Sequence, residues 1–453
     1  MIAAHSPRTT TTIPTLPARS VLGHLRAYRR DRLALLLEVG RRCGDVGAFR
    51  VGPRTFILVN AAELVHAVLV EHAAAVEKDP LLRLFGGPLA RDGLLLSLNA
   101  AHRRQRPLVA PAFQHRRIAV YAGTMARYAD ELQRDWADGG TVDMDAEMTR
   151  LTLRIVGKTL FDADVRGEST AVGVALATVL HEINAALTAV APLPLTWPLP
   201  RNRAYQAAAR RLDATVYRII AERRRDGDDR GDLLSMLLRA RDADDGRGMT
   251  DRQVHDEAMT LFLAGHDTTA HALSWTWYLL ARHPEVCARM RDEADRALAG
   301  RLPTMADLPA LPYTLRVFKE ALRLYPPAFE VGRRVTRPFT LGGYHIPAGA
   351  NLLYSPYTLH RRPDYYPRPE RFDPERFTPE AEATRPRHAF LPFGTGPRNC
   401  IGMSFALMEG QLILATLAQK VTFARADDRE VDPEPAITLK PGRGITMVVQ
   451  RCL

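Results

Sequence analysis

The sequence predicts a mainly α-helical protein with small β-sheets near both ends of the chain. Between residues 116 and 324, long segments place apolar residues three and four positions apart, which is the period of a half-buried helix. Alternating patterns with glycine or proline turns occur over residues 46–59 and return after residue 333. Of the 453 residues, 46% are hydrophobic, which is enough for a large core.

The N-terminal segment predicts a tail followed by a hairpin. Residues 1–12 are polar and rich in threonine, so we expect them to be disordered. Apolar and polar residues then alternate on both sides of Gly52-Pro53, which predicts a β-hairpin over residues 46–59. No linker or internal repeat interrupts the rest, so residues 13–453 are expected to form a single compact domain.

Helical periodicity dominates the middle of the chain. The predicted helices cover residues 116–137, 145–160, 171–190, 203–225, 250–282, 284–299 and 313–324. Several prolines between residues 192 and 200 separate the third of these helices from the fourth.

Strand and turn signals return near the C-terminus. Gly342-Gly343 and Pro347-Ala348-Gly349 predict turns between short strands after residue 333. A final helix is predicted over residues 403–420, and a last hairpin is predicted around Pro441-Gly442.

Composition excludes several classes of function. The formal net charge is +11, but the basic runs lack the interleaved aromatic residues of a nucleic-acid-binding face. A solvated surface in an arginine-rich proteome is the simpler interpretation of the positive charge, and a basic patch that docks an acidic protein is the more specific one. No N-terminal apolar run is long enough to span a membrane. The four cysteines lie far apart, which argues against a disulfide framework and suits a reducing compartment, so we expect a cytoplasmic protein.

One short segment carries most of the chemical information. Residues 393–402 read Phe-Gly-Thr-Gly-Pro-Arg-Asn-Cys-Ile-Gly and precede an apolar helix. A Cys400 thiolate there would lie at a helix N-terminus, where backbone N–H groups stabilise negative charge. Gly394 and Gly396 permit sharp turns, and Arg398 supplies a nearby cation. Such a thiolate holds a metal or attacks an electrophile; the alternative is a buried free cysteine, which needs neither the glycines nor the arginine.

This segment resembles the haem-binding loop of the cytochromes P450. Every fixed position of that motif matches: Phe393, Gly394, Gly396, Arg398, Cys400 and Gly402. The resemblance implies the cytochrome P450 fold, haem b (iron protoporphyrin IX) as cofactor, and Cys400 as the axial iron ligand. In that family the thiolate pushes electron density onto the iron and favours O–O cleavage.

A polar turn inside a long apolar helix adds to the resemblance. Ala264-Gly265-His266-Asp267-Thr268-Thr269 matches the oxygen-activating turn of the family. The resemblance implies that Asp267 and Thr268 form an acid–alcohol pair that delivers protons through water to dioxygen. It also implies that Ala264 and Gly265 leave room for dioxygen, whereas His266 is a bystander. The alternative is a tolerated polar turn in a long helix.

Four basic residues are candidates for binding the haem propionates. The resemblance assigns His102 and Arg106 to one side, and Arg333 and Arg398 to the other. A dianionic group at a partly buried site needs such charge-assisted hydrogen bonds. Arg334 adjoins Arg333, so the assignment could shift by one residue. A solvated basic turn is the alternative for the segment around His102.

Three further residues predict a structural ionic network. Glu320 and Arg323 lie three positions apart on one predicted helix, and Arg376 lies upstream of Cys400. An ordinary surface pair is the simpler interpretation. The resemblance implies instead that the three side chains form a buried network that locks the segment before the haem loop.

The predicted substrate is a hydrophobic small molecule. Segments that line the family's pocket are apolar here, with Leu84, Phe85, Leu95, Phe329 and Val331 as candidate contacts. By analogy with terpene-oxidising members, we expect a terpene, specifically a sesquiterpene of secondary metabolism. A fatty acid is the alternative, and Arg83 or Arg91 could then bind its carboxylate.

These features predict a monooxygenase that inserts one atom of O2 into a C–H bond. The chain carries no nucleotide-binding or flavin domain, so electrons from NAD(P)H are expected to arrive through a separate ferredoxin reductase and ferredoxin. We expect a monomer. A peroxide-using haem-thiolate enzyme and a haem-based sensor or carrier are the alternatives; neither needs the acid–alcohol pair.

Overall fold

The computed structural model describes residues 12–18, 20–162, 169–187, 189, 193–227, 229–242 and 246–452. The predicted N-terminal tail lies outside these residues except for Thr12. Two compact units emerge. The first comprises Met1–Pro80, Glu330–Pro369 and Arg385–Asn399; the second comprises Leu81–Phe329, Glu370–Thr384 and Cys400–Leu453. The single domain expected over residues 13–453 stays a prediction.

The first unit is built on a five-stranded sheet. Its strands, in spatial order, are β1 (Val46–Val51), β2 (Arg54–Val59), β8 (Asn351–Tyr354), β5 (Val331–Val335) and β3 (Val76–Lys78). β2 and β8 are parallel, whereas the other neighbours are antiparallel. The predicted hairpin over residues 46–59 is confirmed: Val46 pairs with Val59.

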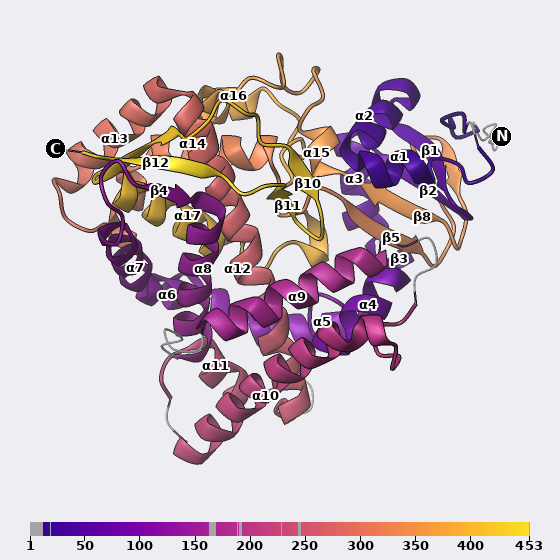
Figure 1. The fold of residues 1–453 in the computed structure, drawn as a ribbon. Helices are drawn as coiled ribbons and strands as arrows, with labels where there is room; N and C mark the ends of the chain where they lie inside the picture. Colours follow the sequence, from indigo (N-terminus) through magenta and orange to yellow (C-terminus); the bar gives the residue numbers. More distant parts are fainter. Residues whose placement is uncertain are drawn as a thin grey trace, which may run out of the picture. The chain divides into compact units, whose positions relative to one another are not determined.

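Short helices and a second hairpin complete the first unit (Figure 1). The helices are α1 (Leu25–Arg30), α2 (Arg32–Cys43), α3 (Ala62–His66) and α15 (Pro356–Leu359). α2 buries Leu36 and Val39 against the sheet. The turn predicted at Gly342-Gly343 is confirmed: it joins β6 (Phe339–Leu341) to β7 (Tyr344–Ile346), with both glycines at positive φ.

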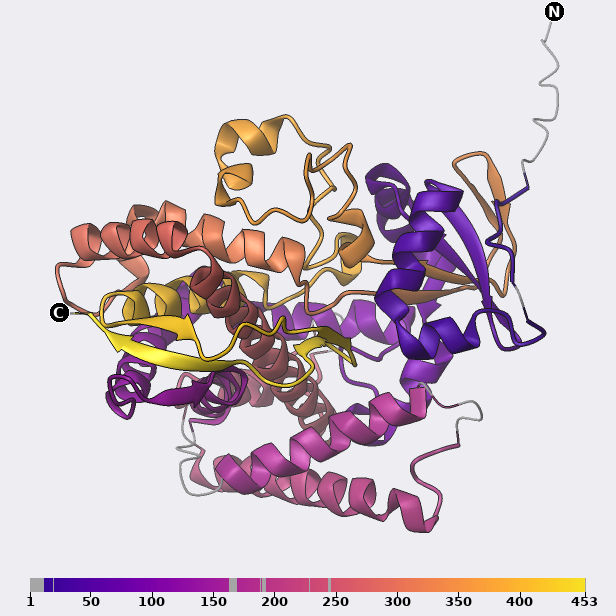
Figure 2. The ribbon, with the colours of Figure 1, turned by 45° about the horizontal axis from the view of Figure 1, so that its top comes forward.

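The second unit is mainly helical (Figures 1 and 2). Its helices are α4 (Pro80–Ala90), α5 (Asn99–Val109), α6 (His115–Ile118), α7 (Ala122–Arg134), α8 (Met144–Phe161), α9 (Ser169–Leu187), α10 (Arg203–Asp226), α11 (Leu233–Arg239), α12 (Asp251–Arg282), α13 (Pro284–Leu298), α14 (Pro312–Leu324), α16 (Pro379–Ala383) and α17 (Met403–Ala418). The helices predicted over 145–160, 203–225, 250–282, 284–299, 313–324 and 403–420 are confirmed to within a few residues.

One predicted helix is divided in the structure. The segment 116–137 forms α6, a 3₁₀ turn at Ala119–Tyr121, and then α7. α12, in contrast, is continuous over 32 residues. It begins at a capping box in which Thr250 and Gln253 satisfy one another's backbone N–H groups.

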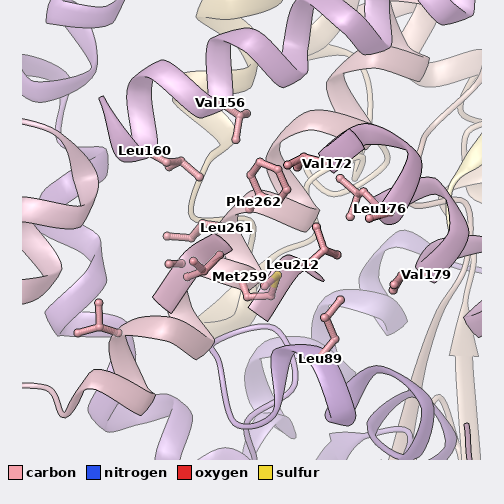
Figure 3. Close-up of a cluster of buried hydrophobic side chains, with 14 of the residues drawn as sticks. Leu89, Val156, Leu160, Val172, Leu176, Val179, Leu212, Met259, Leu261 and Phe262 are labelled. Atoms are coloured by element: carbon pink, nitrogen blue, oxygen red, sulfur yellow. The ribbon is translucent and has the colours of Figure 1, made fainter. Parts of the chain in front are cut away.

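A hydrophobic core joins the helices that flank α12. Figure 3 shows side chains of α8, α9 and α12 converging, with Val156, Val172 and Phe262 among them. Leu89 of α4 and Leu212 of α10 belong to the same cluster. This core fixes the position of the first half of α12, directly before the polar turn.

The predicted C-terminal hairpin is wrong. β11 (Leu439–Pro441) pairs with β10 (Pro433–Pro435), whereas β12 (Thr446–Arg451) lies between β4 (Thr141–Asp143) and β9 (Val421–Arg425). The close approach of Gly444 to Asp143 helps to explain the pairing. A Cβ at position 444 would lie 2.5 Å from the Asp143 carboxylate, and the backbone N–H of Ile445 donates to that carboxylate. These contacts direct the chain toward β4, a partner some 300 residues earlier that local periodicity does not reveal.

Within the part of the chain that the structure describes, every helix is too short or too polar to cross a bilayer.

Candidate active site

Cys400 lies just before α17, whose N-cap is Gly402. The residue is accessible to solvent, yet protein atoms surround it closely. Burial raises the pKa of the Cys400 thiol, while the backbone N–H of Gly402 and the Arg106 guanidinium act in the opposite direction. A cysteine that is both accessible and enclosed is suited to face a bound group, and ligation to a metal would supply the charge that keeps it a thiolate.

The glycines of the loop are required by geometry. Gly396 has φ +75°, and a Cβ there would lie 2.3 Å from the backbone oxygen of Leu69. Gly394 has φ +67°, and its Cβ position is 3.4 Å from the Tyr354 hydroxyl. Because both positions need positive φ, glycine is the residue that fits without strain. Phe393, which precedes them, is half-buried.

A cluster of three cations lies in the first unit. Burial lowers the pKa of Lys78, and the charges of Arg333 and Arg398 lower it further. Burial and Arg333 likewise lower the pKa of Arg398, to about 10, with Glu77 partly compensating. Burial and mutual repulsion of these basic side chains cost free energy, as their lowered pKa values show. A multiply charged anion bound to the three side chains would offset that cost. The cluster therefore fits the propionates of a haem.

The two adjacent arginines have different surroundings. Arg333 is buried at 4% exposure, and burial lowers the pKa of its guanidinium. Arg334 points elsewhere and donates to the Asn351 side chain at 3.1 Å. The arrangement favours Arg333 over Arg334 as the anion-binding residue.

His102 and Arg106 lie one turn apart on α5, in the second unit. His102 is buried. Burial lowers the pKa of Arg106, and the opposing influence is the charge of Cys400. Arg106 is therefore a neighbour of the proposed metal ligand, whereas Arg333 and Arg398 belong to the other unit.

The polar turn of α12 keeps its helical form. The Thr268 hydroxyl donates to the backbone oxygen of Ala264 at 2.8 Å. Burial alone would raise the pKa of Asp267, but His271, His266 and a hydrogen bond from Thr438 together hold it below its usual value. Asp267 is therefore an anion at neutral pH.

Two other residues of this turn have packing roles. A Cβ at Gly265 would lie 3.3 Å from Val156 Cγ2, so glycine here permits the close approach of α8 to α12. His266 is buried and its Nδ1 lies 3.3 Å from the backbone oxygen of Phe262. That space for dioxygen exists at Ala264 and Gly265 stays a prediction.

The structure brings the predicted ionic network together. Glu320 and Arg323 are fully buried and form two hydrogen bonds, at 2.7 and 2.8 Å. Arg376 Nε lies 3.4 Å from Glu320, and the backbone N–H of Asp373 donates to the same carboxylate. Arg323 also donates to the backbone oxygen of Arg371. The network thus fastens α14 to the segment around residues 371–376.

The predicted substrate contacts divide into two groups. Phe85 and Phe329 are almost fully buried, and Phe85 belongs to the core around α12. Leu84 and Leu95 are each 42% exposed, and Val331 is half-buried in β5 of the first unit. The structure therefore does not gather all five side chains into one described apolar cluster.

Sequence reasoning missed three ionisable residues of these elements. They are Lys78 in the cation cluster, His271 one turn after Asp267, and Glu409 on α17. Only His271 left a usable signal, since its spacing of four from Asp267 puts both on one face of a helix.

Comparisons with known proteins agree with this architecture. The family model described as Cytochrome P450 matches residues 14–448. Cyclooctatin synthase of Streptomyces melanosporofaciens is 39% identical, covering 93% of this chain and 92% of its own. Pentalenene oxygenase of Streptomyces avermitilis is 35% identical, covering 92% and 93%. A crystal structure of the cytochrome P450DA heme domain superimposes with a TM-score of 0.89 at 29% identity, covering 98% and 99%.

The helical fold and the cysteine loop define a haem-thiolate oxidoreductase. The chain belongs to the cytochrome P450 family. It is an oxygen-incorporating enzyme whose family uses haem iron, O2 and electrons from redox partners.

Proposed function

We propose that this protein is a monooxygenase that hydroxylates a terpene, with a sesquiterpene as the specific hypothesis. Similarity to known enzymes supports this proposal: the relatives include cyclooctat-9-en-7-ol 5-monooxygenase, at 38% identity, and pentalenene oxygenase. We further propose haem b as the cofactor and NAD(P)H as the ultimate source of electrons.

Two arginines that could bind a carboxylate already form ion pairs with protein carboxylates, which favours a terpene over a fatty acid. A fatty-acid hydroxylase would use a cation such as Arg83 or Arg91 to bind the carboxylate. Arg83 instead pairs with Asp92 at 3.3 Å. Arg91 donates to Tyr217 at 3.1 Å and faces the carboxylates of Asp213 and Asp256. Binding a fatty acid there would mean breaking existing ion pairs.

Cys400 is the proposed haem ligand. Its position beside the N-terminus of α17 and the nearby Arg106 guanidinium support a thiolate at this sulfur. When bound, the haem supplies the iron at which O2 is activated. We assign Arg333 and Arg398 to a propionate on the evidence of their cation cluster, with Lys78 as an additional partner. His102 and Arg106 are proposed as propionate-binding residues of the second unit.

Asp267 and Thr268 are the proposed acid–alcohol pair. The anionic Asp267 can accept a proton from its surroundings and pass it on through water. The Thr268 hydroxyl is held by Ala264 in one rotamer, so its oxygen lone pairs are oriented for an incoming water.

The electron donor is proposed to be an acidic ferredoxin served by a separate reductase. The formal net charge of +11 supports association with an acidic protein. We propose a cytoplasmic monomer. The four cysteines are free thiols in the structure, which suits a reducing compartment.

Spectral titration of the haem-loaded protein tests the substrate class. We expect a saturable low-to-high-spin shift with a sesquiterpene hydrocarbon and none with a long-chain fatty acid, because the hydrocarbon needs no ion partner. A shift with the fatty acid alone would contradict the terpene assignment.

Thr268→Ala tests the enzyme class. We expect electrons from NAD(P)H to be diverted to the formation of peroxide, and fully coupled turnover would refute the role of Thr268.

A further inference from the structure

A chain of polar side chains leads away from Asp267 and begins at Thr438. Thr438 Oγ1 donates to Asp267 Oδ2 at 2.6 Å. Thr438 comes from the segment just before β11, which Trp275 fastens to α12 by donating to the backbone oxygen of Leu439 at 3.0 Å. The hydroxyl is therefore held in place by contacts other than its own hydrogen bond to Asp267.

His271 is the next member of the chain. It lies one helical turn after Asp267, and its side chain is only 6% exposed. Its Nδ1 is 3.0 Å from Thr438 Oγ1. Because the Thr438 proton is directed to Asp267, the Thr438 oxygen accepts a hydrogen bond from His271 Nδ1–H. This fixes which imidazole nitrogen carries the proton.

Asp145 stands at the other side of the imidazole. It lies in the first turn of α8, and its Oδ1 is 3.7 Å from His271 Nε2. The buried Oδ1 atom forms no hydrogen bond within the described residues. A separation of 3.7 Å suits an ion pair or a bridging water. With 20% of its side chain exposed, Asp145 is the best-exposed of the three ionisable groups in the chain.

Carboxylates flank the imidazole on both sides: Asp145 Oδ1 is 3.7 Å from Nε2, and Asp267 Oδ2 is 3.7 Å from Nδ1. The pKa of Asp145 is raised and that of Asp267 is lowered, so Asp145 holds a proton more readily than Asp267 does. Burial raises the pKa of Asp145; His271 and a hydrogen bond with Ser274 oppose this effect, whereas the charges of Asp143 and Asp267 add to it. His266 and Lys440 are the other charged or titratable groups that act on Asp267. Lys440 is itself paired with Glu434.

We propose that His271 is a positioning residue that passes protons from Asp145 to Asp267 through the hydroxyl of Thr438. The proton balance is simple. Nε2 takes a proton from Asp145, Nδ1 gives its proton to Thr438, and Thr438 gives its own proton to Asp267. Asp145 then regains a proton from solvent, and the imidazole returns to its Nδ1–H tautomer by exchanging protons with water; no group is oxidised or reduced.

This inference rests on the proposed role of Asp267 and Thr268, so its test must separate the two. The variants are His271→Gln and Asp145→Asn in the holoenzyme. Glutamine can still donate a hydrogen bond to Thr438 but cannot carry a proton. His283→Gln is the matched control, since His283 caps the C-terminus of the same helix and its imidazole hydrogen-bonds to the backbone oxygen of Leu279.

The first measurement is product formed per NAD(P)H consumed, across pH 6 to 9. We expect both variants to divert reducing equivalents to peroxide and to alter the pH profile. The loss should be smaller than the ~100-fold that is typical when a direct acid or base is removed. If Asp267→Asn and Thr268→Ala uncouple turnover while His271→Gln keeps the wild-type coupling and profile, the relay is refuted and the acid–alcohol pair stands. If those two variants also stay coupled, the proposed function itself fails.

The second measurement does not depend on turnover. The tautomer of His271 is read from the imidazole nitrogen shifts of 15N-histidine-labelled holoenzyme, with the signal assigned by its absence in His271→Gln and, independently, in His271→Asn. We expect the proton on Nδ1, because the Thr438 oxygen accepts a hydrogen bond from that nitrogen. A proton on Nε2 in the resting enzyme would break the chain at Thr438 and would overturn the proposal.

Discussion

At the scale of single residues, α17 of the second unit contains a buried carboxylic side chain. Glu409 is fully buried, and burial raises the pKa of its carboxyl to about 8, with the Thr269 hydroxyl offsetting only part of the effect. In an unfolded chain the same carboxyl titrates near ~4.3. Between these values the folded protein holds a proton that the unfolded chain releases.

Glu409 therefore makes stability fall as pH rises. Below pH ~4.3 the carboxyl is protonated in both states; from there to about pH 8 each unit lowers the free energy of unfolding by up to ~1.4 kcal/mol. Glu409→Gln removes this dependence, so we expect its melting temperature to exceed that of the wild type increasingly between pH 5 and 8. Thermal denaturation at a series of pH values measures the difference.

The exposed Glu430→Gln is the control for this experiment. Glu430 pairs with Arg282 at the surface, where such a pair contributes ~0–1 kcal/mol. A difference between Glu409→Gln and wild type that stays flat with pH would show that Glu409 is not held protonated.

Individual residues also show how far sequence reasoning reached. Cys400 and its glycines were predictable because one loop contains the whole pattern. Lys78 was not, since its partners Arg333 and Arg398 lie more than 250 residues away and nothing local distinguishes it. Gly265 was predicted to leave room for dioxygen, but its missing Cβ also faces Val156, a contact that only packing reveals.

At the scale of elements, α14 and α17 approach closely at one glycine. A Cβ at Gly410 would lie 2.4 Å from the Phe318 ring, which is buried and cannot shift freely. We expect Gly410→Ala to destabilise the protein by ~1–3 kcal/mol through overpacking. Urea denaturation measures the change in the free energy of unfolding.

Gly123 provides a matched comparison on another helix. It lies in α7, and nothing is within 4 Å of its Cβ position. Gly123→Ala should therefore stabilise the protein by ~0.5–1 kcal/mol, because glycine is costly in a helix interior. If both substitutions had the same sign, the contact with Phe318 would not explain the glycine at position 410.

Elements differ in how predictable they were. The long helices were read correctly because a 3.6-residue period repeats over many turns, as in α10 and α12. The prediction for the C-terminal strands is wrong because β12 pairs with β4, which lies far earlier in the chain, at Thr141–Asp143. Neighbouring strand signals suggested a local hairpin, and sequence alone contains no register information to exclude it.

At the scale of the whole molecule, the net charge of +11 bears on electron supply. If the donor is an acidic ferredoxin, long-range attraction should accelerate its association. We expect the second-order rate of reduction to fall steeply as ionic strength rises above ~0.1 M, where the screening length is ~10 Å. Stopped-flow reduction at several salt concentrations measures this. A rate that is independent of salt would contradict a charge-steered partner.

The central claim is that Cys400 binds the haem iron, and the absorption spectrum of the reduced carbon monoxide complex tests it most directly. We expect the wild type and Cys452→Ser, a control at another free cysteine, to show the red-shifted Soret band of thiolate ligation. Cys400→Ser should lose that band. Retention of the thiolate band in Cys400→Ser would contradict the account.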